Sequence, residues 1–217
     1  RAGVRNMVLD ELLVSGASFR AGMQIADDVN AAKAKLIYLV FEEFEKQLAG
    51  VAERNHWTRE KKSNWYEYKE QADEFFYKWN TTYPGINYIV NDAQMPDGKQ
   101  LWFRVEVKHR LFAGFCVFDP NAESEEGHGD QVDEYDAATV KAVGHYLKIS
   151  AADHNDWWAT WWYLPAGEQK PNDSVPNFKI MNDAAIALAD KECRSEFVSL
   201  CVRNIEEMVE RVLAIPE

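Results

Sequence analysis

Three ionisable residues in the middle of the chain have the spacing of a metal-dependent catalytic site. Asp97 follows Pro96, and Glu106 and Lys108 complete the pattern P-D-x8-E-x-K. Two carboxylates in such a pattern can hold a magnesium ion while the lysine orients or activates the attacking water. One interpretation of the sequence is therefore a Mg²⁺-dependent nuclease, with Asp97, Glu106 and Lys108 as its catalytic residues.

Strand and turn preferences give these residues a second interpretation. In a strand from Leu101 to His109, alternate side chains point to opposite faces, so Trp102, Arg104, Glu106 and Lys108 share one face. A half-solvated strand needs the same alternation, with its charges facing water. The Asp-Gly pair just before this strand is also a hairpin turn signal. On this interpretation the aspartate is a turn former, and the match to a catalytic pattern is a coincidence.

The charge balance bears on the partners of the chain. With 24 basic and 36 acidic residues the net charge is −12, and phosphate contacts need a high density of lysine and arginine. We therefore expect no strong nucleic-acid binding by this chain alone. The segment 119–136 carries eight acidic residues and neither lysine nor arginine. It departs from a calcium loop, with Ser124 at the invariant glycine position, so we expect a solvated loop.

Other cofactor chemistry has little support in the sequence. Cys116, Cys193 and Cys201 have neither metal-ligand spacing nor an even count, which favours a reducing cytoplasmic setting. The histidines contain no helical i,i+3 or i,i+4 pair, so we expect no metal site and no cofactor in this chain. No apolar run is long enough to span a membrane. The chain begins at Arg1 without an initiator methionine, and we expect it to be a piece of a longer protein.

Two apolar stripes of helical period precede residue 84. The first runs from Ile25 to Leu48 in steps of three or four and predicts a long helix packed on one side, capped by Ser18 and ended by Gly50. The second stripe is aromatic and runs from Trp65 to Trp79. Such rings could stack on bases or sugars, but a charged opposite face favours core packing.

Period-two patterns then predict a meander. Strands at 86–90, 101–109 and 111–118 are joined by short links and should pair antiparallel. Gly114 inside the third strand indicates a bulge or the close approach of another backbone.

The last third of the chain returns to helical patterns, with helices predicted at 137–149 and 192–213. Between them lie Trp157, Trp158, Trp161 and Trp162, whose pattern fits a helix or a strand. Four tryptophans are too much apolar area to leave exposed on a soluble monomer, so we expect them to form core or a self-association surface.

The fold class predicted from these elements is α+β. An antiparallel meander of three or more strands should pack with long N-terminal, middle and C-terminal helices in a single domain, 1–217. Its parts are a helical region at 1–83, the meander at 86–118, the acidic loop at 119–136 and a helical, tryptophan-rich region at 137–217.

The order of these segments resembles bacterial proteins of the PD-(D/E)XK nuclease superfamily. The runs 25–36 and 41–48 look like the region downstream of their catalytic core. The strand Leu101–Val107 followed by 111–115 is similar to a strand pair with a glycine step in their C-terminal domains. The segment from Trp157 to Leu164 and the terminal helix fit the same order. The resemblance covers most of the chain as pattern and order.

The resemblance implies a non-catalytic accessory domain. In such proteins a helix with Gln-x-x-x-Tyr follows the Glu-x-Lys strand, whereas here a third strand and the acidic loop follow Lys108. The expected function is recognition, oligomerisation or sensing, with the rest of the parent nuclease-family protein as partner and a second copy as a further candidate. The expected binding surface comprises Trp102, Arg104, Trp158 and Trp161.

Overall fold

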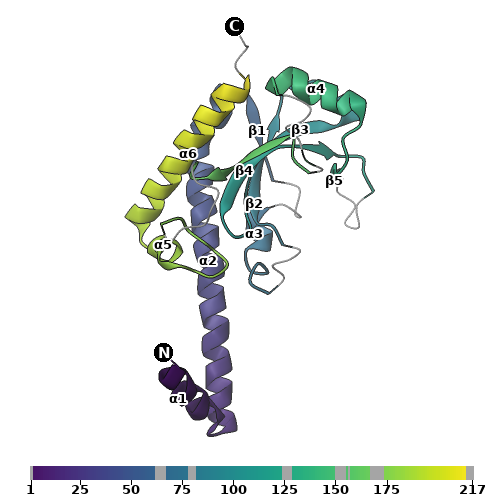
Figure 1. Cartoon of the computed structure of the whole chain (residues 1–217). Helices are drawn as coiled ribbons and strands as arrows, with labels where there is room; N and C mark the ends of the chain where they lie inside the picture. The colour runs from purple at the N-terminus through teal and green to yellow at the C-terminus, as the bar shows by residue number, and fades with distance from the viewer. Residues whose placement is uncertain are drawn as a thin grey trace.

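The computed structural model describes residues 2–61, 67–77, 82–123, 129–149, 155, 157–166 and 174–213. Its fold is α+β, as predicted (Figure 1). The helices are α1 (Ala2–Leu13), α2 (Gly16–Arg54), α3 (Tyr68–Gln71), α4 (Ala137–Leu147), α5 (Asp183–Ala187) and α6 (Lys191–Leu213), with the 3₁₀ turn η2 (Pro96–Gly98). The strands are β1 (Trp57–Glu60), β2 (Gly85–Val90), β3 (Gln100–Val107), β4 (Leu111–Asp119), β5 (Asp130–Gln131) and β6 (Thr160–Leu164).

The strands form one antiparallel sheet in the order β1-β2-β3-β4-β5, and β6 also pairs with β4. The predicted meander is confirmed, because β2, β3 and β4 pair consecutively. Since β3 occupies one edge of β4, the strands β5 and β6 share the other edge. Register sets Arg104 opposite Gly114 and Glu106 opposite Phe112.

One face of the sheet is the main core. Along β3 the side chains of Leu101, Phe103, Val105 and Val107 enter this core, as the alternation predicts. Figure 1 shows α2 and α6 side by side against the sheet, and α6 supplies buried side chains such as Ile205. Apolar residues at helical spacing therefore meet apolar residues at strand spacing, which is what holds the two layers together.

The opposite face of β3 is also buried, which differs from the solvated face that the alternation alone allows. Arg104 and Glu106 are only 1% and 7% exposed. The ring of Trp102 stacks on Phe118 at 3.9 Å between centroids, in a second apolar cluster that includes Trp158. Charges on this strand are therefore balanced inside the protein rather than by water.

The long helix α2 differs from the prediction at both ends. Ser15 is its N-cap, accepting a hydrogen bond from the Ser18 backbone N–H at 3.0 Å, so Ser18 lies inside the helix. Gly50 does not end it, because α2 continues to Arg54. Leu36 to Leu48 of the stripe is buried, but its first part is exposed. That first part projects from the body, with α1 folded back at its tip (Figure 1).

Two aromatic segments contain less helix than their sequence patterns predict or allow. After α3 the chain continues in turns rather than a long helix, although Tyr68, Ala72 and Phe75 are buried as the stripe predicts. Trp65 and Trp79 lie outside the described residues. The sequence left open whether the tryptophan cluster forms a helix or a strand. Trp161 and Trp162 lie in the strand β6, and of these two only Trp162 faces the main core.

The acidic loop contributes more structure than a solvated loop would. Its residues Asp130 and Gln131 form β5, and Asp136 is the N-cap of α4, accepting from the Thr139 backbone N–H at 2.7 Å. Residues 124–128 of the loop lie outside the described part. Within the described residues, no helix combines the length and apolar character needed to cross a bilayer.

Candidate functional site

The structure does not bring Asp97 and Glu106 together. Asp97 lies exposed in η2, where φ of 57° for Asp97 and 75° for Gly98 give the turn that the Asp-Gly pair predicts. Glu106 lies near the other end of β3, and a strand rises about 20 Å from Gln100 to Glu106. Among the described residues no three His, Cys, Asp or Glu side chains are grouped to hold a metal ion.

Glu106 instead forms a buried ion pair. Its carboxylate accepts from the Arg104 Nε at 2.6 Å, and the guanidinium also donates to Asn87 Oδ1 and to the Tyr83 carbonyl, each at 2.7 Å. Burial raises the pKa of Glu106, and the neighbouring Arg104 opposes that shift. The pair occupies the second face of the sheet and adjoins a concave surface.

That surface, the aromatic groove, lies over the start of β4, β6 and the segment before β6. It consists of two adjoining hollows of about 370 and 360 Å³ that share Lys108, Phe112 and Trp158. Each is within the size range of small-ligand sites. The remaining lining residues are Tyr83, Glu106, His109, Arg110, Gln131, Asn155, Trp157, Trp161 and Tyr163.

Edge-to-face ring contacts build the walls of the aromatic groove. Phe112 meets Trp158 at 5.4 Å and Trp161 at 6.1 Å between ring centroids, and Trp161 meets Tyr163 at 5.0 Å. Such contacts are favourable and hold the rings in defined orientations. Trp161 remains 39% exposed, so part of its ring is open to a ligand.

The first hollow has a basic end at the β3–β4 turn. Lys108, His109 and Arg110 follow one another there. The Arg110 guanidinium lies over the Tyr163 ring at 4.7 Å, and the Lys108 ammonium lies 5.5 Å from the Tyr83 ring centroid. Partial burial and the nearby Lys179 and Lys108 lower the pKa of His109. The local positive charge contrasts with the net charge of −12 of the whole chain.

Hydrogen bonds fix the turn that presents Trp157 and Trp158. The Asn155 Oδ1 accepts from both of their backbone N–H groups, at 2.9 and 2.7 Å. The Trp157 carbonyl accepts from Gln131 Nε2 at 2.5 Å and from the Tyr135 hydroxyl at 3.3 Å. Trp157 is nevertheless 49% exposed. An exposed ring on a fixed backbone is typical of a recognition surface, because little ordering remains to be lost on binding.

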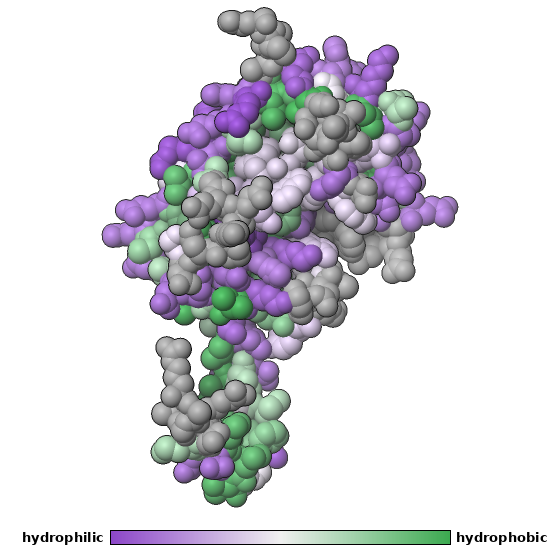
Figure 2. Space-filling view, in the orientation of Figure 1, coloured by the Kyte–Doolittle hydropathy of each residue, from purple (hydrophilic) through white to green (hydrophobic). Residues whose placement is uncertain are grey.

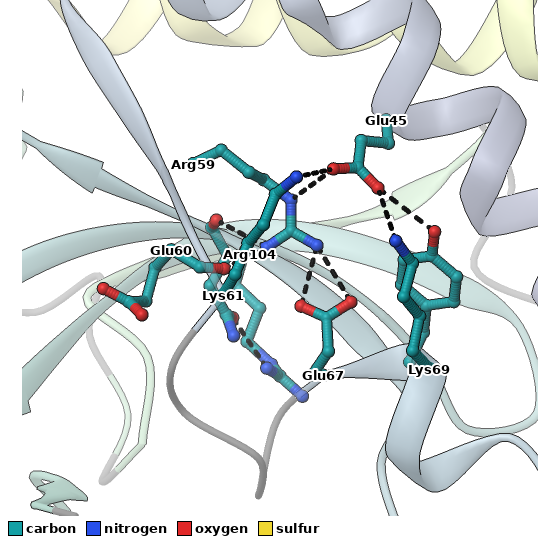
Figure 3. Close-up of polar contacts among 9 residues, drawn as sticks. Glu45, Arg59, Glu60, Lys61, Glu67, Lys69 and Arg104 are labelled. Carbon is teal, nitrogen blue, oxygen red and sulfur yellow. Dashed lines mark hydrogen bonds and ion pairs between the residues drawn. The ribbon is translucent and has the colours of Figure 1, made fainter.

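A second polar cluster lies on the helix-facing side of the sheet edge (Figure 3). Arg59 of β1 donates from one nitrogen to both Glu67 oxygens, at 2.9 and 2.8 Å, and lies 3.5 Å from Glu45 of α2. Glu45 also pairs with Lys61 at 3.0 Å and Lys69 at 3.7 Å. Burial raises the pKa of Glu67, and Arg59 opposes it. Because opposite charges are matched across three elements, we interpret this cluster as a structural tie.

The predicted binding residues divide into two groups. Trp158 and Trp161 line the aromatic groove, whereas Trp102 and Arg104 are buried outside its lining. Trp102 packs in the same apolar cluster as Trp158, and Arg104 pairs with Glu106 of the groove wall. The sequence pattern missed Phe112, Arg110 and Tyr163. The signal for Phe112 was its place on the alternate face of β4, but the groove also needs β6 alongside β4, and that pairing brings Tyr163 opposite Phe112.

Comparisons of the chain with protein-family models, with curated proteins and with solved structures found no match. The resemblance to the PD-(D/E)XK nuclease superfamily therefore stays a prediction from sequence order.

Proposed function

We propose that this chain is a recognition domain whose aromatic groove binds a small anionic ligand with a flat ring system. One observation carries the proposal: the partly exposed rings of Trp157 and Trp161 lie in hollows that also contain Lys108. A flat ring gains from stacking on such side chains, and an anionic group gains from the exposed ammonium of Lys108.

The charge distribution favours a small anion over a polymer. A net charge of −12 repels a nucleic-acid strand, since a strand needs many phosphate contacts along its length. A single phosphate or carboxylate needs only the local charge of the β3–β4 turn. Hollows of about 370 and 360 Å³ match this scale, at the small end of ligand sites.

The proposal fits an accessory domain rather than a catalytic one. Its relation to a larger nuclease-family protein rests on the resemblance of the sequence alone. A recognition role needs the groove only, so it can be tested on this chain without the parent protein.

Tryptophan fluorescence during titration with adenosine monophosphate provides the test, with adenosine and inorganic phosphate as partial ligands. We expect saturable quenching by adenosine monophosphate, binding of adenosine at least about tenfold weaker, and no quenching by phosphate alone up to about 1 mM. Lys108→Gln should weaken the binding of adenosine monophosphate by about tenfold and leave the affinity for adenosine unchanged. The matched control is Lys46→Gln, an exposed lysine on α2.

Three results would contradict this proposal. One is no binding of adenosine monophosphate up to about 1 mM. The second is equal affinity for adenosine and its monophosphate, which would remove the anionic requirement. The third is unchanged binding in Trp161→Ala, because its ring forms a wall of the first hollow.

A further inference from the structure

The projecting part of the chain exposes an unusual amount of apolar surface. This arm comprises α1, the link to α2 and residues 16–33 of α2, beyond the body of the protein (Figure 1). Figure 2 shows hydrophobic side chains gathered on the projection at the bottom of the view. Its large apolar side chains, each 46% to 72% exposed, are Met7, Val8, Leu9, Leu13, Val14, Phe19, Met23, Ile25 and Val29.

Packing of α1 on α2 covers only the middle of the apolar face. A Cβ at Gly22 would lie 2.3 Å from Leu12 Cδ2, so α1 rests directly over this glycine. At 100° per residue, Phe19 and Met23 project to one side of Gly22, at roughly 60° and 100°, and Ile25 to the other side at roughly 60°. Both flanks of the hairpin therefore remain open for a further layer of helices.

The exposed area is that of a protein interface. The exposed fractions of the nine side chains add up to the area of about five fully exposed large side chains. At roughly 150 Å² or more for each, this is on the order of 800 Å² per chain, which is the area one partner contributes to a stable complex. Monomers rarely expose patches beyond a few hundred Å².

We propose that the arm is a dimerisation element, through which two copies of this chain form an antiparallel four-helix bundle. A second copy offers an arm of the same length, with the same two apolar flanks, as a two-fold interface requires. Two helical hairpins brought together in this way cover exposed apolar side chains of all four helices. The arm stands clear of the body, so two arms can meet without contact between the sheets. This inference is independent of ligand binding in the aromatic groove.

Sedimentation velocity over about 1 to 100 µM tests the dimer by mass action. Phe19→Glu combined with Ile25→Glu changes both flanks, at two side chains that are 51% and 63% exposed. The matched control is Ile180→Glu combined with Ile186→Glu, two isoleucines of the body that are 71% and 54% exposed. A milder variant, Phe19→Gln with Ile25→Gln, removes apolar area without adding charge. Near-UV circular dichroism of the tryptophans checks that the body of each variant is folded.

We expect the wild-type chain to dimerise in this range. The glutamate arm variant should raise the dissociation constant of the dimer by at least about 100-fold, and the glutamine arm variant by at least about tenfold. The body control should change this constant by less than about threefold. A wild-type chain that is monomeric at about 100 µM overturns the proposal. So does an arm variant that dimerises like the wild type, or a body control weakened as much as the arm variant.

Discussion

Arg104 and Glu106 point to the same side of β3 and form an ion pair at 2.6 Å with almost no solvent access. The Arg104 guanidinium is held on its other sides by Asn87 Oδ1 and the Tyr83 carbonyl. This pair explains how a strand with two charged residues can be covered on both faces. The Glu106 carboxylate lies in the wall of the aromatic groove, and the Arg104 cation balances its charge.

Removing the arginine should destabilise the protein strongly near neutral pH. Arg104→Met leaves the Glu106 carboxylate buried without its cation, and breaking such a pair costs about 3–5 kcal/mol in the free energy of unfolding. Urea unfolding of the wild type and the variant at pH 7 measures this loss.

The loss should shrink as the pH falls. Burial already raises the pKa of Glu106 in the folded protein, and loss of Arg104 raises it further. A carboxyl whose pKa is higher in the folded than in the unfolded state binds its proton more tightly when folded. The buried carboxylate therefore destabilises the protein most at pH values above the folded pKa, and the destabilisation disappears below the unfolded pKa. Adding Glu106→Leu to the variant should recover most of the stability. An equal loss at pH 5 and pH 7 would contradict this assignment.

The two tryptophans of the groove should differ in their structural contribution. Trp158→Ala should lower the free energy of unfolding by about 3–5 kcal/mol, because this ring is 9% exposed within the second apolar cluster. Trp161→Ala should cost less, about 1 kcal/mol, because this residue is 39% exposed and lies outside both apolar clusters. Chemical denaturation of both variants decides the point, and a larger loss for Trp161 would show that the groove wall is misassigned.

Gly114 should tolerate no side chain. A Cβ at this position would lie 2.3 Å from the Thr160 carbonyl oxygen and 2.8 Å from the Trp161 Cα, so Gly114→Ala must push β6 away from β4. We expect a loss of about 2 kcal/mol or more, measured by thermal unfolding, together with changed near-UV dichroism. The control is Gly16→Ala, where nothing lies within 4 Å of the new Cβ. Wild-type stability of the Gly114 variant would contradict the close approach of the two backbones.

The chain should not cleave DNA or RNA with magnesium or manganese. The reason is the separation of about 20 Å that β3 puts between the turn of Asp97 and the position of Glu106, too far for one ion. Asp97→Ala should change stability by no more than about 0.5 kcal/mol, because the residue is exposed. Metal-dependent cleavage that is lost in both Asp97→Ala and Glu106→Ala, with folding intact, would reverse this conclusion.

Local chemistry in the sequence was enough to predict the elements with strong signals. The period of two from 86 to 118 predicted the meander, because consecutive strands joined by short turns pair antiparallel. Asp97-Gly98 predicted its turn, since both residues accept positive φ. The helices predicted at 137–149 and 192–213 are present as α4 (Ala137–Leu147) and α6 (Lys191–Leu213).

Tertiary structure decided what those elements bury and bring together. The stripe from Ile25 to Leu48 has one period, yet only its second half meets the sheet, and periodicity carries no information on where a partner layer ends. Arg104 and Glu106 look solvent-facing in the sequence, because the further partners of Arg104, Asn87 and the Tyr83 carbonyl, come from other segments. The aromatic groove exists only because β6 pairs with β4, and that long-range pairing depends on the whole sheet rather than on any local pattern.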